Sequence, residues 1–131
     1  MILYSENNRP TAGAVAQLYQ SSGVSQPITD LVRIQTMLDN TNLIISAWEE
    51  SRLVGIARAL TDYGYCCYLA DLVVDRKYQK MSIGSSLIRL IQKAIGIEVS
   101  LALISAPDTT QFYEKLGFKS VTNGYIVNGI F

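Results

Sequence analysis

The chain has 131 residues, of which 49% are apolar, and this is the size and composition of one domain with a single hydrophobic core. Its eleven basic and eleven acidic side chains cancel, so the positive field typical of nucleic-acid-binding proteins is missing. The sequence contains no histidine, which is the commonest zinc ligand and the usual base beside a serine or cysteine nucleophile. We therefore expect one domain over residues 1–131, with no nucleic-acid partner and no metal.

The N-terminus and the two cysteines bear on the cellular compartment. Residues 1–6 do not combine a basic segment with an apolar one, and no apolar run is long enough to span a bilayer. Cys66 and Cys67 are adjacent on a predicted strand, so their side chains should point to opposite faces and not pair with each other. Unpaired thiols are typical of a reducing compartment. We expect a cytoplasmic protein with no membrane partner.

The first forty residues predict a short strand and two helices. Residues 2–5 are apolar and end in a polar turn, which is the pattern of a short opening strand. Apolar side chains then recur at helical spacing and predict a helix that ends near residues 21–23. A second helix is expected over residues 29–40, again with one apolar face.

The middle of the chain predicts three consecutive antiparallel strands. Residues 43–48 and 53–60 are apolar and bracket the polar residues 49–52, the pattern of two strands joined by a short loop. Residues 61–64 predict a second turn, and residues 65–74 a long third strand. These strands form an antiparallel meander.

A helix and a further strand are predicted to follow the meander. A buried stripe at helical spacing predicts a helix that ends near residues 94–96. The stripe comprises Gly84, Leu87, Ile88, Ile91 and Ile95. Residues 99–104 are apolar and predict a strand. Since a strand, a helix and a strand of these lengths form a βαβ unit, the last strand should run parallel to the one before the helix.

The chain closes with a short predicted helix and a predicted hairpin. Asp108 and Gln111 have the spacing of a capping box, and Gly117 is a C-terminal stop. An Asn-Gly turn joins residues 118–121 to residues 125–130 and predicts a hairpin. The expected fold is α/β, an α+β domain with a mixed sheet, built from an antiparallel meander, a βαβ crossover and a closing hairpin.

Two segments carry most of the functional information. In residues 74–87 an apolar strand enters a polar turn that opens an amphipathic helix. Backbone N–H groups at a helix N-terminus have no partner within the helix, and the helix dipole adds partial positive charge, so such a turn can bind a phosphate. Residues 112–118 read Phe-Tyr-Glu-Lys-Leu-Gly-Phe. Together the two segments resemble the acetyl-CoA site of the GCN5-related N-acetyltransferase (GNAT) family.

The family's phosphate motif has the form Gln/Arg-x-x-Gly-x-Gly/Ala, which Gln79 and Gly84 match at its first and last positions. Ser82 stands where the first glycine is usual; its Cβ could crowd the loop, or its hydroxyl could donate to a phosphate. The resemblance implies that the turn binds the pyrophosphate and that the backbone of the preceding strand binds the pantetheine arm. The implied contacts are Leu72, Val73 and Val74 on the strand, and Gln79, Lys80, Met81, Ser82, Ile83, Gly84 and Ser85 in the turn.

The resemblance also implies catalytic roles. The family tyrosine at the position of Tyr113 places its hydroxyl near the cofactor sulfur, where a phenol can protonate the departing thiolate. A base must deprotonate the amine; without histidine the candidates are the carboxylates of Asp71, which directly precedes the cofactor strand segment, and Asp62. Besides Ser82, two further departures from the family are Tyr68, where some members have a glutamate, and residues 106–108, which lack a cofactor-binding asparagine.

The resemblance implies an acetyl-CoA-dependent N-acetyltransferase that moves an acetyl group directly to a primary amine of a small molecule or peptide. Ser82 and the missing asparagine leave an alternative, a CoA or acyl-CoA sensor that binds the cofactor without turnover. A third interpretation is a structural α/β domain that binds no CoA. The apolar closing hairpin, with Ile126, Val127, Ile130 and Phe131, is a candidate homodimer interface.

Overall fold

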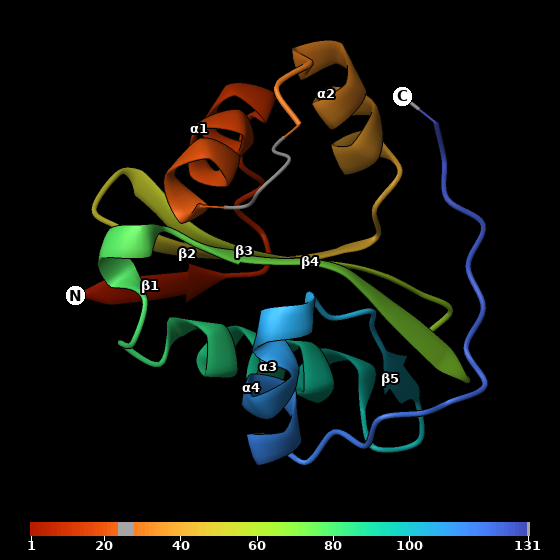
Figure 1. Cartoon of the computed structure of the whole chain (residues 1–131). Coiled ribbons are helices and arrows are strands. Elements are labelled where there is room, and N and C mark those ends of the chain that lie inside the picture. Colours follow the sequence, from red (N-terminus) through yellow and green to blue (C-terminus); the bar gives the residue numbers. More distant parts are fainter. Residues whose placement is uncertain (24–27, 131) are drawn as a thin grey trace.

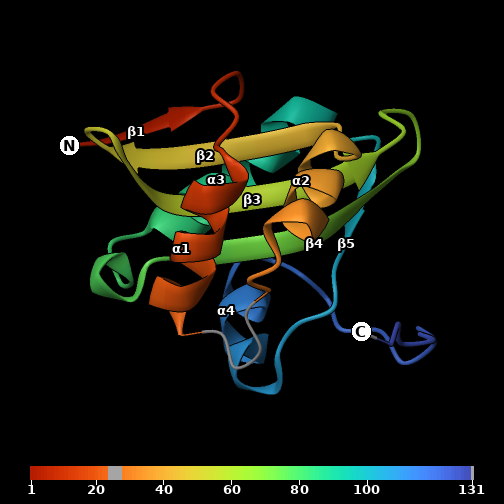
Figure 2. The ribbon, with the colours of Figure 1, turned by 90° about the horizontal axis from the view of Figure 1, so that it is seen from above.

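A five-stranded mixed sheet separates two layers of helices in the computed structural model, which describes residues 1–23 and 28–130 (Figure 1). In their order across the sheet the strands are β1 Ile2–Ser5, β2 Leu43–Glu49, β3 Arg52–Thr61, β4 Cys66–Val74 and β5 Ser100–Ala102. The helices are α1 Ala12–Ser22, α2 Leu31–Asp39, α3 Ile83–Ile95 and α4 Thr110–Lys115. Short 3-10 turns, η1 Arg76–Tyr78 and η2 Pro107–Thr109, precede α3 and α4. Figure 2 shows α1 and α2 over one face of the sheet, with α3 on the other.

The strand directions confirm the predicted meander and crossover. β1 to β4 pair antiparallel in sequence order, and β5 pairs parallel to β4 after α3. The parallel ladder joins only residues 66–68 of β4 to β5. Cys66 is exposed and Cys67 is buried, and both thiols are unpaired, as the strand alternation predicts. Burial raises the pKa of the Cys67 thiol.

Each face of the sheet has its own apolar core because alternate residues of a strand point to opposite faces. On β2, Ile45 packs toward α3, whereas its neighbour Ile44 packs toward α1 and α2. The predicted stripe of α3 is confirmed, because Leu87, Ile88 and Ile91 are almost completely buried against the sheet. The two cores hold the helices on both faces of β3 and β4, where the implied functional residues lie.

The ends of several elements differ from the prediction. Asp30 caps α2 by accepting hydrogen bonds from the N–H groups of Val32 and Arg33, so the helix begins two residues later than the predicted residue 29. The last strand is shorter than the predicted residues 99–104. No helix within residues 1–23 and 28–130 has both the length and the hydropathy needed to cross a bilayer.

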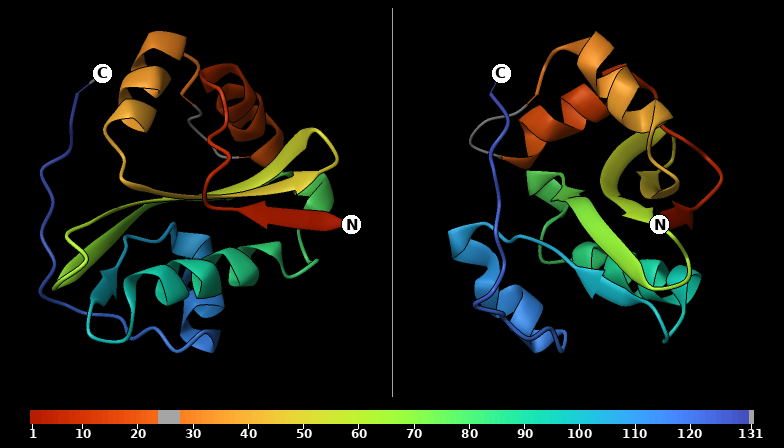
Figure 3. Two further views of the ribbon diagram at one scale, coloured as in Figure 1. Left: turned by 180° about the vertical axis from the view of Figure 1, so that it is seen from behind. Right: turned by 90° about the vertical axis from the view of Figure 1, so that its right-hand side faces the viewer.

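The prediction of a closing hairpin is wrong for the single chain. Residues 118–130 contain no strand, and most of their side chains are exposed. Turn and strand propensities are local, whereas two short strands are stable only when one face is packed against other elements. Here the segment runs along the outside of the molecule (Figure 3). Phe131, the last residue of the predicted hairpin interface, lies outside the described residues.

Candidate functional site

The last part of β4 has an open edge. β5 covers residues 66–68 of β4, while β3 pairs with β4 on its other side as far as Val74. Leu69 lies opposite Ala59 and Asp71 lies opposite Arg58, so Ala70 is an extra residue that forms a β-bulge. A bulge bends a strand and increases its twist. β4 and β5 therefore pair at one end only, and no described strand pairs with residues 69–74 along that edge.

Backbone alternation decides which residues of this edge can bind a ligand. The N–H of Asp75 donates to the carbonyl of Val54 on β3 over 2.8 Å. Successive residues of a strand direct their N–H and C=O groups to opposite sides, so Leu72 and Val74 present theirs to the open edge. Val73 faces β3, and its side chain is buried in the core under α1. The structure therefore places Leu72 and Val74 at the edge, but not Val73.

The turn that follows β4 leads directly into the start of α3. Lys80 and Ser82 have φ values of 68° and 64°, in the left-handed region. The Ser82 side chain makes no capping hydrogen bond, while its carbonyl accepts the N–H of Ser86 over 3.0 Å. The preceding N–H groups, those of residues 83–85, belong to the first turn of α3 and have no acceptor within the helix. This arrangement fits a phosphate or pyrophosphate.

A buried carboxylate fixes the junction between β4 and this turn. Asp75 is 2% exposed, and it accepts hydrogen bonds from the Lys77 N–H and from Nη2 of Arg52. Burial alone would raise the pKa of Asp75, yet these donors hold it below its ordinary value. The ionised side chain thus keeps η1 in place between the open edge and the turn.

The Gln79 side chain links the turn to β4 and α1 by hydrogen bonds. Its Nε2 donates to the carbonyl of Val74 over 3.0 Å and to the carbonyl of Ser22 at the end of α1 over 3.3 Å. The side chain therefore joins three segments: β4, the turn and α1. The resemblance implies a cofactor contact for Gln79, and the geometry gives it a positioning role.

Gly84 connects the two motifs of the sequence. A Cβ placed on this residue would lie 3.2 Å from Cζ of Phe112 on α4, tighter than an ordinary contact. The missing side chain therefore allows Phe112 to pack against α3. The sequence suggests a phosphate role for this glycine, and the structure gives it a packing role as well.

Tyr113 lies next to Phe112 on α4. Its ring packs edge-to-face against Phe112 and Phe118, with centroids 5.0 and 5.6 Å apart. Burial raises the pKa of Tyr113, so the phenol stays protonated at neutral pH. Within the described part of the chain its hydroxyl makes no hydrogen bond. A protonated phenol without a partner is suited to donate a proton to a developing thiolate.

Asp71 forms part of a polar network on the opposite face of the sheet. Its Oδ2 accepts hydrogen bonds from the Tyr19 hydroxyl over 2.6 Å and from Nε of Arg58 over 2.8 Å. Nη1 of Arg58 also donates to the Thr41 hydroxyl. Burial, and then the Asp71 carboxylate, raise the pKa of Tyr19 far above its ordinary value of 10.0. The network fastens α1 to β3 and β4 and holds the Asp71 carboxylate rigidly.

Asp62, the other candidate base, shapes the β3–β4 hairpin. Its Oδ1 accepts the N–H groups of Gly64, Tyr65 and Cys66 at 2.7 to 3.0 Å. Hydrogen bonds from these amides, that of Tyr65 foremost, lower the pKa of Asp62 to about 2. A carboxylate with so low a pKa is a poor base near neutral pH. The geometry therefore favours a structural role for Asp62.

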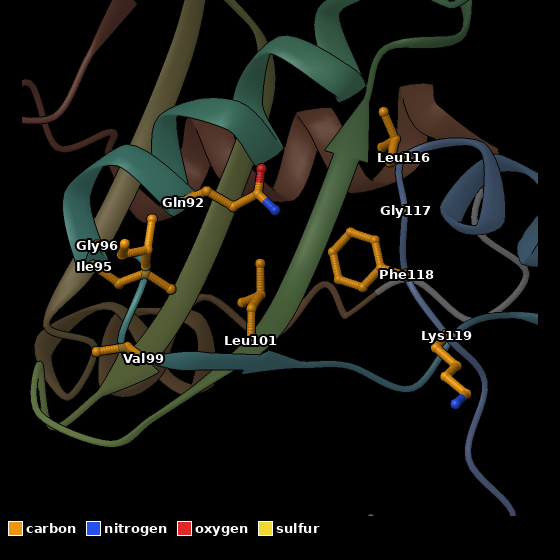
Figure 4. A pocket seen from close by; sticks show the side chains of 10 residues that line it. Gln92, Ile95, Gly96, Val99, Leu101, Leu116, Gly117, Phe118 and Lys119 are labelled. Atoms are coloured by element: carbon orange, nitrogen blue, oxygen red, sulfur yellow. The ribbon is translucent and has the colours of Figure 1, made fainter.

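Two parts of this arrangement were missed by sequence reasoning. One is the network of Tyr19, Asp71 and Arg58, for which a charged residue inside the apolar stretch of β3 was the available signal. The other is a cavity of about 580 Å³ at the C-terminal end of α3 (Figure 4). Side chains that line it include Gln92, Ile95, Val99, Leu101, Leu116 and Phe118. The residues of α3 that line this cavity are at the opposite end of the helix from the turn.

Comparisons with known proteins identify a family and a relative that are similar to this chain. The acetyltransferase (GNAT) domain family matches residues 15–131. An uncharacterized N-acetyltransferase, ycf52 of Pyropia yezoensis, is 34% identical over 137 aligned positions, which cover 99% of this chain and 76% of the relative.

Solved structures have the same fold. A probable acetyltransferase from meticillin-resistant Staphylococcus aureus has a TM-score of 0.85 at 24% identity, over 98% of this chain and 100% of its own. An aminoglycoside N-acetyltransferase in complex with CoA has a TM-score of 0.73 at 15% identity, over 98% of this chain and 95% of its own. The family match over residues 15–131 and the relative that is 34% identical establish that the chain belongs to the GNAT family of acetyltransferases.

Proposed function

We propose that this protein is an acetyl-CoA-dependent N-acetyltransferase that moves the acetyl group directly to a primary amine of a small molecule or peptide. The observation that carries the proposal is the continuity of two binding surfaces. The open edge of β4 ends at Val74, and the chain then returns within eight residues to the uncapped start of α3 at Ile83. CoA has the matching shape, because an extended pantetheine arm leads to a pyrophosphate.

In this proposal the backbone of Leu72 and Val74 binds the pantetheine arm in the manner of an added strand. The N–H groups of residues 80–85, which include Lys80, Met81 and Ser85, bind the pyrophosphate. Gln79 and Gly84 shape the turn, and Val73 supports the edge from the core. The solved CoA complex of a relative with the same fold supports the choice of cofactor.

Tyr113 is proposed as the proton donor. Acetyl-CoA supplies a thioester, whose carbonyl carbon is attacked by the amine. As the new C–N bond forms and the C–S bond breaks, the electron pair of the C–S bond goes to sulfur, and the Tyr113 hydroxyl protonates the thiolate. The nitrogen gives up one proton to solvent water, which leaves a neutral amide. Solvent then reprotonates the tyrosinate. The raised pKa of Tyr113 supports this role because it keeps the phenol protonated at the pH of the reaction.

Asp71 is proposed to orient the acceptor amine. Its Oδ2 is occupied by Tyr19 and Arg58, whereas Oδ1 accepts no hydrogen bond within residues 1–23 and 28–130. This oxygen can accept a hydrogen bond from an ammonium group, and the rigid network keeps it in one position beside the bulge of β4. Proton abstraction from the amine by Asp71, through a relaying water, stays a prediction.

The compartment is also a proposal. The two unpaired thiols favour a reducing interior. The sequence-based expectation is the cytoplasm, while two relatives from Arabidopsis thaliana are named chloroplastic, which favours a plastid. Imaging of a fluorescent fusion in the native host distinguishes the two.

Titration calorimetry with CoA tests the proposed cofactor site. Ser85→Asp puts a carboxylate in the first turn of α3, where it favours the helix but repels a pyrophosphate. We expect CoA affinity to fall by at least about tenfold, since like charges in contact cost more than one kcal/mol. Ser85→Asn is the matched neutral control and should bind nearly normally. Equal affinities for the aspartate and asparagine variants would mean that the phosphates bind elsewhere.

A further inference from the structure

Ala70, the extra residue of the β-bulge in β4, lies where β4 and β5 separate. Within the described residues it has no partner on β3, and its half-buried side chain packs against neither of the two apolar cores. The ladder between β4 and β5 ends at Tyr68, two residues before Ala70. The methyl group of Ala70 is therefore a free side chain at the beginning of the open edge.

The chain after β5 forms the other side of this opening. β5 runs parallel to β4, and the last pair of the ladder joins Ala102 to Tyr68. If the pairing continued, Ile104 would stand opposite Ala70. Ile104 is 62% exposed, and the residue before each of these two is also apolar. The opening between the two strands therefore has apolar residues on both sides.

Two parts of the proposed complex bring the thioester to this opening. With the pyrophosphate at residues 80–85 and the pantetheine arm along Leu72 and Val74, the sulfur end of the cofactor extends along β4 toward the bulge. Asp71, which is proposed to orient the acceptor amine, directly follows Ala70 in the chain. Because the amine nitrogen must reach the acyl carbon, the acyl group lies beside Ala70.

We propose that Ala70 sets the length of the acyl group that this protein binds and transfers, and that its small side chain admits propionyl as well as acetyl. This inference rests on the proposed function. Burial of one more methylene between apolar residues is favourable, because it removes apolar surface from water. The transfer itself is unchanged. The amine nitrogen bonds to the acyl carbon, and the electron pair of the C–S bond goes to sulfur. The nitrogen gives up one proton to water and Tyr113 protonates the thiolate, so the products are an N-propionyl amide and CoA.

Calorimetric titration with CoA, acetyl-CoA and propionyl-CoA tests the binding of the acyl group without an acceptor. Ala70→Val adds two methyl groups, and since φ of Ala70 is not positive, valine can take its backbone conformation. We expect this variant to bind propionyl-CoA at least about tenfold more weakly than the wild type does, the scale of one misfitted methylene. Its affinity for CoA, which has no acyl group, should be unchanged. Ala102→Val, at an exposed alanine of β5, is the matched control and should bind all three ligands like the wild type.

Turnover with the two thioesters tests the selectivity of transfer. We expect the wild-type kcat/KM for propionyl-CoA to lie within about tenfold of that for acetyl-CoA, and Ala70→Val to lower the ratio of the two by about tenfold or more. Equal affinities of the wild type and Ala70→Val for propionyl-CoA would overturn the inference, as would a wild type that binds acetyl-CoA but not propionyl-CoA. Binding of CoA without turnover of any amine would contradict the proposed function alone, because the binding comparison needs no acceptor.

Discussion

The Gln79 side chain donates a hydrogen bond to the main-chain carbonyl of Val74, and this bond of 3.0 Å joins the turn before α3 to the open edge of β4. This side chain therefore helps to hold the two surfaces proposed to bind CoA in one geometry, together with the buried Asp75 carboxylate. The same amide also donates to the carbonyl of Ser22, which links the site to α1.

Replacement of Gln79 by alanine should weaken CoA binding. The loss of hydrogen bonds that position the turn is expected to cost about 1 kcal/mol, or roughly fivefold in affinity. Calorimetric titration with CoA measures this change. Gln20→Ala, on the exposed face of α1, is the matched control and should bind like the wild type. Unchanged affinity in Gln79→Ala would mean that the turn holds its shape without this side chain.

Ser82→Gly should stabilise the fold. Ser82 has φ of 64°, a conformation that costs an L-residue about 1–2 kcal/mol, while the greater freedom of glycine in the unfolded chain offsets about 0.4–1 kcal/mol. We expect a net gain of about 0.5 kcal/mol in the free energy of unfolding, measured with urea. Ser82→Ala keeps the strain and should show no gain. Equal stabilities of the two variants would argue against strain at this position.

The same two variants test the Ser82 hydroxyl. If the hydroxyl donates to a phosphate, both should bind CoA more weakly by about 1 kcal/mol, the usual scale of one hydrogen bond. We expect this result, because the Ser82 side chain makes no capping bond that would occupy it. Tighter binding by Ser82→Gly would instead show that the Cβ crowds the loop.

Tyr19→Phe should destabilise the protein. The substitution removes a hydrogen bond of 2.6 Å to the Asp71 carboxylate, and bonds to charged groups contribute about 1.5–3 kcal/mol. Because Arg58 still pairs with Asp71, we expect the free energy of unfolding to fall by about 1.5 kcal/mol, the lower end of this range. Urea unfolding of this variant and of Tyr65→Phe, whose ring is 78% exposed, provides the comparison. A stability equal to that of the control would show that the bond to Asp71 contributes nothing net.

The hydrogen bond between Tyr19 and Asp71 also predicts that the stability of the protein depends on pH. The folded-state pKa of Tyr19 lies above its ordinary value of 10.0, so the unfolded chain loses this proton first as the pH rises. The protonated phenol contributes fully to the free energy of unfolding below pH 10, and this contribution is lost progressively as the pH rises above 10. The stability of the wild type should therefore fall more steeply above pH 10 than that of Tyr19→Phe. Parallel curves would contradict the assignment.

Local patterns in the sequence were sufficient to predict most of the helices and strands and their order. The alternation in β2 and β3 and the stripe of Leu87, Ile88 and Ile91 depend on periodicity, which the chain carries within each element. The closing hairpin was predicted from equally good local signals and is wrong for the single chain, where residues 119–130 are all exposed. Whether a segment pairs depends on its neighbours, and propensity alone does not contain them.

The candidate site was predictable in its position along the chain but not in its detail. The turn and Tyr113 follow from motifs. The burial of Val73 and the contact of Gly84 with Phe112 arise from strand alternation and helix packing between distant segments. The bond from Tyr19 to Asp71 spans 52 residues, and no spacing rule connects the two.

Tyr113→Phe should lower kcat by about tenfold to a thousandfold while leaving CoA affinity unchanged, because the hydroxyl acts as the thiolate leaves. The variant should also keep its stability, since the hydroxyl has no hydrogen-bond partner within the described residues. Normal turnover in this variant would remove Tyr113 from the mechanism and leave solvent as the proton source.

The release of free thiol from acetyl-CoA, measured with a panel of primary amines and peptides, tests the central claim most directly. The account predicts that thiol release depends on the acceptor, with one acetyl group gained by the acceptor, seen by mass spectrometry, for each thiol released. CoA binding without acceptor-dependent release from any amine would contradict the claim and identify a sensor that has kept the fold and the cofactor site.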